Sequence, residues 1–219
     1  MKLMFSLVTV LFVTLQLCKA AAGAGGWELV FLADQGTGDV VYDKWVNPPS
    51  NPPCEDTSCA CSWRQQLPCL NCTWKSDKVD AWANVKEVKV AYYTNCTEVA
   101  FIVFNAAGKD KMNWFDVTKV TSSSWTSLTS TSSALHPQFS LKGHGSILRR
   151  FFAAKNYGGC PNDRFWMLVV DSGPLSKHPC DYDHTPNVYP HFYYNPTGSA
   201  SLVRAIQMPL ADTFTIYIR

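Results

Sequence analysis

The densest group of residues able to do chemistry lies between positions 178 and 191. It holds three histidines, His178, His184 and His191, and two aspartates, Asp181 and Asp183. Imidazole and carboxylate groups together bind divalent transition metals, so this group is a candidate metal site. Its spacing matches no familiar zinc motif. The favoured interpretation is a surface loop pinned by a disulfide, with its polar residues facing water.

Motifs for other kinds of catalysis are missing from the sequence. It has no G-x-S-x-G, S-x-x-K or H-E-x-x-H pattern. Cys69 and Cys72 have C-x-x-C spacing, but a second such pair and a thioredoxin-like setting are absent. The loop Asp34–Asp39 has too few oxygen ligands for calcium and indicates a turn. We therefore expect a protein that is not an enzyme and needs no cofactor.

Aromatic residues are abundant and suggest binding. The chain has 8 Trp, 9 Tyr and 12 Phe residues. Trp63 and Trp74 lie in a cysteine-rich segment and Trp125 in a serine-rich one, both expected to be loops. Exposed rings on a β scaffold can stack on sugars or anchor a protein partner. The alternative is that these rings pack under the loops as small satellite cores. Trp63 and Trp74 are the candidate binding residues.

The cysteines predict a disulfide framework. Nine cysteines include Cys18 in the leader, which leaves eight: Cys54, Cys59, Cys61, Cys69, Cys72, Cys96, Cys160 and Cys180. An even number in a secreted chain is typical of complete pairing. Five of the eight lie between positions 54 and 72, and five is odd. At least one bond must therefore join this cluster to the rest of the chain.

Two sequons predict N-linked glycans. Asn71 and Asn95 are each followed by Cys and Thr, which satisfies the N-x-Thr pattern. Glycosylation would place both residues at the surface. The segment 121–133 is almost entirely Ser and Thr, and it indicates a polar loop, with O-glycosylation as the alternative.

The first twenty residues predict a secretory signal peptide. Lys2 precedes an apolar run from Leu3 to Leu17, and cleavage is expected after Ala20. The run is shorter than the roughly 20 residues that cross a bilayer, so no membrane span is expected. The chain has 19 Lys+Arg and 17 Asp+Glu; removing Lys2 and Lys19 leaves 17 of each. A neutral chain lacks the charge that nucleic acid binding requires. Residues 21–219 are expected to form a single secreted β-rich domain.

Apolar periodicity predicts a mostly β fold. Alternation is clear around Val88–Tyr92 and Phe214–Ile218, and Glu98–Asn105 is apolar on both faces. Five further segments are expected to be strands: Trp27–Leu32, Asn113–Val117, Ile147–Ala153, Phe165–Val170 and Ser201–Ile206. Residues 93–97 suggest a hairpin loop, and 76–84 a short helix capped by Ser76. Together they favour an antiparallel sandwich or partly closed barrel with disulfide-rich loops.

Two resemblances add to this interpretation. Gly25–Phe31 with Trp45, and the ending Ala211–Arg219, resemble fibrinogen-related and intelectin-type lectin domains. The calcium-loop pattern of those families has no match here, so none of their ligand residues carries over. A second resemblance covers more of the chain, at Trp27–Phe31, Val41–Trp45, Asn113–Phe115, Arg149–Phe152 and Gly158–Cys160. These segments are similar to uncharacterised secreted proteins of marine invertebrates, some of them in shell or skeletal organic matrix.

The first hypothesis is therefore an extracellular glycoprotein that acts by binding, as an organic-matrix component without catalytic activity. The resemblance suggests a role in biomineralization, although the neutral charge does not favour direct mineral binding. Expected partners are extracellular matrix proteins or glycans. A lectin-like carbohydrate-recognition protein is the second hypothesis, and a metal-dependent enzyme built on residues 178–191 is the third.

Overall fold

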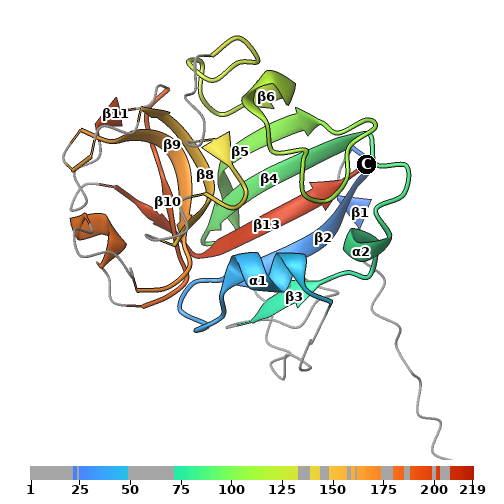
Figure 1. The fold of residues 1–219 in the computed structure, drawn as a ribbon, viewed down its shortest axis with the longest axis horizontal. Helices are drawn as coiled ribbons and strands as arrows, with labels where there is room; N and C mark the ends of the chain where they lie inside the picture. Colours follow the sequence, from blue (N-terminus) through green and yellow to red (C-terminus); the bar gives the residue numbers. More distant parts are fainter. Residues whose placement is uncertain are drawn as a thin grey trace, which may run out of the picture.

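The described chain is built around two antiparallel β-sheets (Figure 1). The computed structural model describes residues 22–23, 25–48, 72–132, 139–143, 148–156, 159–160, 162–173, 180–184, 188–198, 201–202 and 208–219. The prediction of a mostly β fold is confirmed.

The larger sheet has seven strands in the order β1-β2-β13-β4-β5-β6, with β3 paired to β2. The C-terminal strand β13 thus pairs with β2 and β4, which lie far from it in the sequence. The bounds are β1 Ala22–Gly23, β2 Trp27–Asp34, β3 Thr73–Lys75, β4 Glu87–Thr94, β5 Thr97–Asn105, β6 Val120–Ser123 and β13 Thr213–Ile218.

The smaller sheet has six strands in the order β12-β10-β9-β8-β7, with β11 paired to β9. The bounds are β7 Phe139–Ser140, β8 Arg149–Asn156, β9 Arg164–Val170, β10 His191–Tyr194, β11 Ser201–Leu202 and β12 Leu210–Ala211. The short 3-10 helices η2 and η3 span Val117–Lys119 and Asp181–Asp183. The α-helices are α1, Val41–Val46, and α2, Lys78–Ala81.

Side chains from both sheets meet in one apolar core. Phe214 of β13 contacts Phe151 of β8, with ring centroids 4.9 Å apart, and Phe192 of β10, at 5.8 Å. All three side chains are fully buried, and burying a phenylalanine contributes about 1.5–3 kcal/mol. The alternation predicted for Phe214–Ile218 therefore places every second residue of β13 in this core.

The predicted hairpin between β4 and β5 is confirmed. Its loop is Asn95 and Cys96, with φ angles of 47° and 65°. Two successive residues with positive φ are typical of a type I′ turn, whose twist matches that of the paired strands. Asn adopts this conformation more readily than most residues, so its position here has a local cause.

Helix α1 was not predicted, because its ends are stabilised by residues distant in the sequence. The Asp171 carboxylate, which follows β9, accepts hydrogen bonds from the amides of Val41 at 2.8 Å and Tyr42 at 3.0 Å. At the other end, Lys75 and Lys111 donate to carbonyl oxygens of residues 45–47. A six-residue helix is marginal alone, and these bonds satisfy groups that have no partner within it.

One prediction about secondary structure is wrong, and another is correct only in part. Asn113–Val117 is not a strand: Asp110 accepts hydrogen bonds from the Met112 amide and the Asn113 side chain, which holds the chain in turns. The serine-rich segment 121–133 is not simply a polar loop either. It starts within β6, and Trp125 and Leu128 are buried in the common core.

Other predicted elements differ mainly in their bounds. The helix expected over 76–84 is limited to α2, and the Ser76 hydroxyl accepts from the Lys78 amide at 3.3 Å. The strand expected at Ile147–Ala153 begins at Arg149 and continues to Asn156. Of the strand expected at Ser201–Ile206, only β11 lies within the described residues.

Candidate functional site

The predicted metal-binding histidines lie in different environments. His184 is exposed after η3, whereas His191 is fully buried at the start of β10. The His191 ring nitrogens lie 3.0 Å from the Val188 carbonyl oxygen and 3.1 Å from that of Tyr182. Both nitrogens thus face oxygen atoms of the chain and none is directed at a metal. His178 lies outside the described residues.

Within the described ranges, no three His, Cys, Asp or Glu side chains come close enough to hold a metal ion. Burial lowers the pKa of His191, against the two carbonyl oxygens, which raise it. The metal site stays a prediction, and it would require His191 to leave its present position.

The aspartate next to these histidines has a different role. Asp183 is fully buried and accepts two hydrogen bonds from Arg149, which also reaches Asp163 at 3.1 Å. The Tyr182 hydroxyl donates to the same Asp163, and its ring lies 4.5 Å from the Arg149 guanidinium. Burial raises the pKa of Tyr182. This buried cluster holds η3 against β8. The interpretation of the loop as one whose polar residues all face water is therefore wrong.

The cysteines reinforce the same attachment. Cys160 and Cys180 form a disulfide with their Cα atoms 5.5 Å apart, directly before η3. Cys96 is disulfide-bonded as well. Cys72 is buried beside β2. Cys54, Cys59, Cys61 and Cys69 lie outside the described residues.

The candidate binding tryptophans are only partly described. Trp74 lies on β3, opposite Leu32, and is partly buried against a small apolar cluster that includes Leu32 and Cys72. Trp63 lies outside the described residues. Trp125 is buried, and its indole donates to the Asn195 carbonyl oxygen at 2.8 Å, so it belongs to the core.

Asn95, one of the two predicted glycosylation sites, is exposed at the tip of the β4–β5 hairpin. Its backbone amide donates to Asp212 at 2.8 Å, which fixes the turn without using the Asn95 side chain. Asn71 lies outside the described residues.

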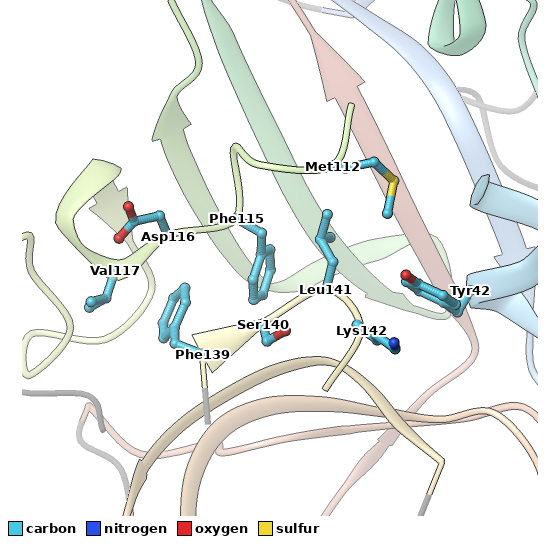
Figure 2. A pocket seen from close by; sticks show the side chains of 9 residues that line it. All are labelled: Tyr42, Met112, Phe115, Asp116, Val117, Phe139, Ser140, Leu141 and Lys142. Atoms are coloured by element: carbon cyan, nitrogen blue, oxygen red, sulfur yellow. The ribbon is translucent and has the colours of Figure 1, made fainter. Parts of the chain in front are cut away.

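A pocket of about 370 Å³ opens between α1, the segment 112–117 and β7 (Figure 2). Its size falls within the range of small-molecule sites. Five apolar side chains line it: Met112, Phe115, Val117, Phe139 and Leu141. Tyr42, Asp116, Ser140 and Lys142 supply its polar groups.

The apolar floor is held by the core behind it. The rings of Phe115 and Phe139 are 5.0 Å apart, and Phe104 of β5 lies within 5.0 Å of Phe115. Met112 also lines the pocket and is 38% exposed. The floor is therefore packed against the core, with an accessible apolar side chain at one edge.

The polar groups divide between the two ends of the pocket. Figure 2 shows Asp116 and Val117 at one end and Tyr42 and Lys142 at the other. The Asp116 carboxylate accepts from both the amide and the hydroxyl of Thr118, at 2.9 Å each. The pocket thus has an acidic end and a basic end, separated by aromatic rings.

Arg150 contacts both residues of the basic end. It donates to the Lys142 carbonyl oxygen at 2.5 Å, and its guanidinium lies 4.9 Å from the centre of the Tyr42 ring. Its Nε lies 3.7 Å from Asp171, too far for a hydrogen bond, and is buried without a partner. Burial raises the pKa of Asp171 to about 7, against the two amide hydrogen bonds and Arg150, which lower it.

No protein-family model, no curated protein and no solved structure matches this chain. Among the described residues, no helix is long and apolar enough to cross a membrane.

The pocket residues come from three separate parts of the sequence, and sequence reasoning identified none of them as a site. The alternation of Phe139, Ser140, Leu141 and Lys142 was one usable signal, because it indicates a short strand with one apolar face. Nothing local to that strand shows that α1 and segment 112–117 lie beside it.

Proposed function

We propose that this protein is a secreted extracellular glycoprotein that acts by binding, as a component of an organic matrix without catalytic activity. Its partners are matrix proteins or glycans. The observation that carries the proposal is the pocket with an aromatic floor packed on the core and polar groups at both ends. Such a combination of apolar surface and a few placed polar groups is typical of ligand sites.

Extracellular location has separate support. The leader sequence, the disulfide between Cys160 and Cys180 and the exposed sequon at Asn95 all fit the secretory route. We further propose that the two sheets form a sandwich, since they share one core. We also propose that the cysteine-rich segment supplies disulfide-rich loops.

Carbohydrate recognition is the second candidate, and the pocket favours it. A sugar ring has an apolar face and a rim of hydroxyl groups. Here an aromatic floor lies between the Asp116 carboxylate and the Tyr42 hydroxyl, which can accept and donate hydrogen bonds to such a rim. A metal-dependent enzyme at residues 178–191 is the third candidate, on its sequence pattern alone.

The test places a larger side chain at the edge of the pocket. Met112→Trp should block it, because Met112 lines the pocket and is exposed. Val188→Trp is the matched control, since Val188 is the other exposed large apolar residue of the described chain, at 45%, and does not line the pocket. The secreted proteins are applied to a glycan array and to matrix laid down by cultured cells. Loss of binding in Met112→Trp alone supports the proposal, and equal binding by both variants contradicts it.

Trp74→Ala, with Trp63→Ala, tests the alternative binding surface predicted from the sequence. A true aromatic anchor contributes about 2 kcal/mol, or roughly thirtyfold in affinity. If these variants lose binding while folding normally and Met112→Trp does not, the pocket is not the site.

A further inference from the structure

We infer that the pocket binds a small organic anion, with the carboxylate of the ligand beside Lys142 and Tyr42 and its ring or chain on Phe115 and Phe139. This inference rests on the proposed function, because it requires the pocket to be the ligand site. Beyond the proposed function, it states that the ligand is an anion and that its carboxylate lies at the Lys142 end.

The charges lining the pocket determine the orientation of the ligand in it. Within the described part of the chain, Lys142 makes no ion pair and is exposed, and the Tyr42 hydroxyl makes no hydrogen bond. Both groups are donors and lie at the same end of the pocket (Figure 2). An ammonium group and a phenol hydroxyl at one end of a pocket suit a carboxylate, because charge-assisted hydrogen bonds are about twice as strong as neutral ones.

Arg150 adds to the positive potential at that end. Its buried Nε has no hydrogen-bond partner, and the nearest carboxylate, Asp171, already accepts the amides of Val41 and Tyr42. Because burial raises the pKa of Asp171, part of the Asp171 carboxyl is protonated near neutral pH. Its negative charge then neutralises less of the Arg150 positive charge. The guanidinium charge behind the Tyr42 ring therefore acts on the pocket.

The opposite end excludes an anion. Asp116 lies there, and its carboxylate is fixed by Thr118. A second negative charge near it would be repelled, whereas a hydroxyl group would be accepted. Between the ends, Phe115, Phe139 and Leu141 offer apolar surface to a ring or chain. The fitting ligand is a carboxylate with an apolar face, supplied either by an acidic sugar or by an aromatic acid.

The experiment compares carboxylates with neutral counterparts by calorimetry and saturation-transfer NMR. Glucuronate is paired with methyl glucoside, and phenylpropionate with phenylpropanol. We expect at least one carboxylate to bind about tenfold more tightly than its neutral partner, with the preference decreasing as salt is added. Glucuronate alone would indicate an acidic saccharide, and phenylpropionate alone an aromatic acid.

Lys142→Ala should remove the preference for the carboxylate. Lys86→Ala is the matched control, because Lys86 is also exposed and does not line the pocket. Equal affinity for charged and neutral probes, an unchanged preference in Lys142→Ala, or no binding of either carboxylate at millimolar concentration would overturn the inference. If neutral probes bind and Met112→Trp abolishes that binding, the proposed function stands while this inference fails.

Discussion

Arg149 and Asp183 form a fully buried ion pair that joins the smaller sheet to the loop crossing it. Two hydrogen bonds link them, from Nε to Oδ1 at 2.8 Å and from Nη2 to Oδ2 at 2.7 Å. The same carboxylate accepts the Cys180 amide at 2.7 Å, next to the disulfide. One loop segment is thus held by a salt bridge, a backbone contact and a covalent bond.

Arg149→Met should destabilise the protein by about 3–5 kcal/mol, because it leaves Asp163 and Asp183 buried without their cation. Urea denaturation of the variant measures this loss. Arg164→Met is the control, since Arg164 is exposed on the neighbouring strand and should cost less than about 1 kcal/mol. A similar loss in both variants would mean that the pair has no special role.

Asp171 should make stability depend on pH. Its pKa is raised to about 7 by burial, whereas the unfolded value is 3.8. Between these values the folded state holds a proton that the unfolded state has lost. This contribution to stability is therefore complete below about pH 4 and is lost as pH rises through 7, by up to about 1.4 kcal/mol per pH unit.

Asp171→Asn provides the comparison, because it removes the titrating group and keeps one acceptor for α1. Unfolding free energies of both proteins are measured from pH 4 to 8. The wild type should lose stability relative to Asp171→Asn as pH rises. A difference that stays constant with pH would contradict this assignment.

Peptide mapping should recover Cys160 linked to Cys180. With these two paired, Cys96 is the one remaining mature cysteine outside the 54–72 cluster, so the bond predicted to leave that cluster must reach Cys96. Loss of the Cys160–Cys180 bond should lower stability by about 2–5 kcal/mol. Two or more free thiols in the denatured mature chain would refute the complete framework.

Material secreted from eukaryotic cells should carry a glycan at Asn95. Thr97→Val removes the sequon but keeps Asn95, whose positive φ suits the turn. Thr97→Ser is the matched control, because it preserves the sequon. Glycosidase should shift the mass of wild type and Thr97→Ser by more than that of Thr97→Val. Asn71 is expected to be modified too, so an identical shift in all three proteins would assign the glycan to that site alone.

The strands with a strong local pattern could be predicted from the sequence. β2, β4, β5, β8, β9 and β13 have the expected alternation or apolar runs, and the β4–β5 turn has residues suited to positive φ. The predicted strand at Asn113–Val117 failed because Asp110 holds that segment in turns. Local hydrogen bonds there outweighed a short apolar pattern.

The sequence by itself determined the mostly β character, since strand periodicity and turn chemistry are local properties. Tertiary structure decided the site. Helix α1 exists because Asp171, 130 residues from Val41, caps one end, and lysines from two other segments cap the other. The same helix then brings Tyr42 to Lys142 and Phe115. Such pairings depend on how the two sheets meet, and no local pattern in the chain encodes that geometry.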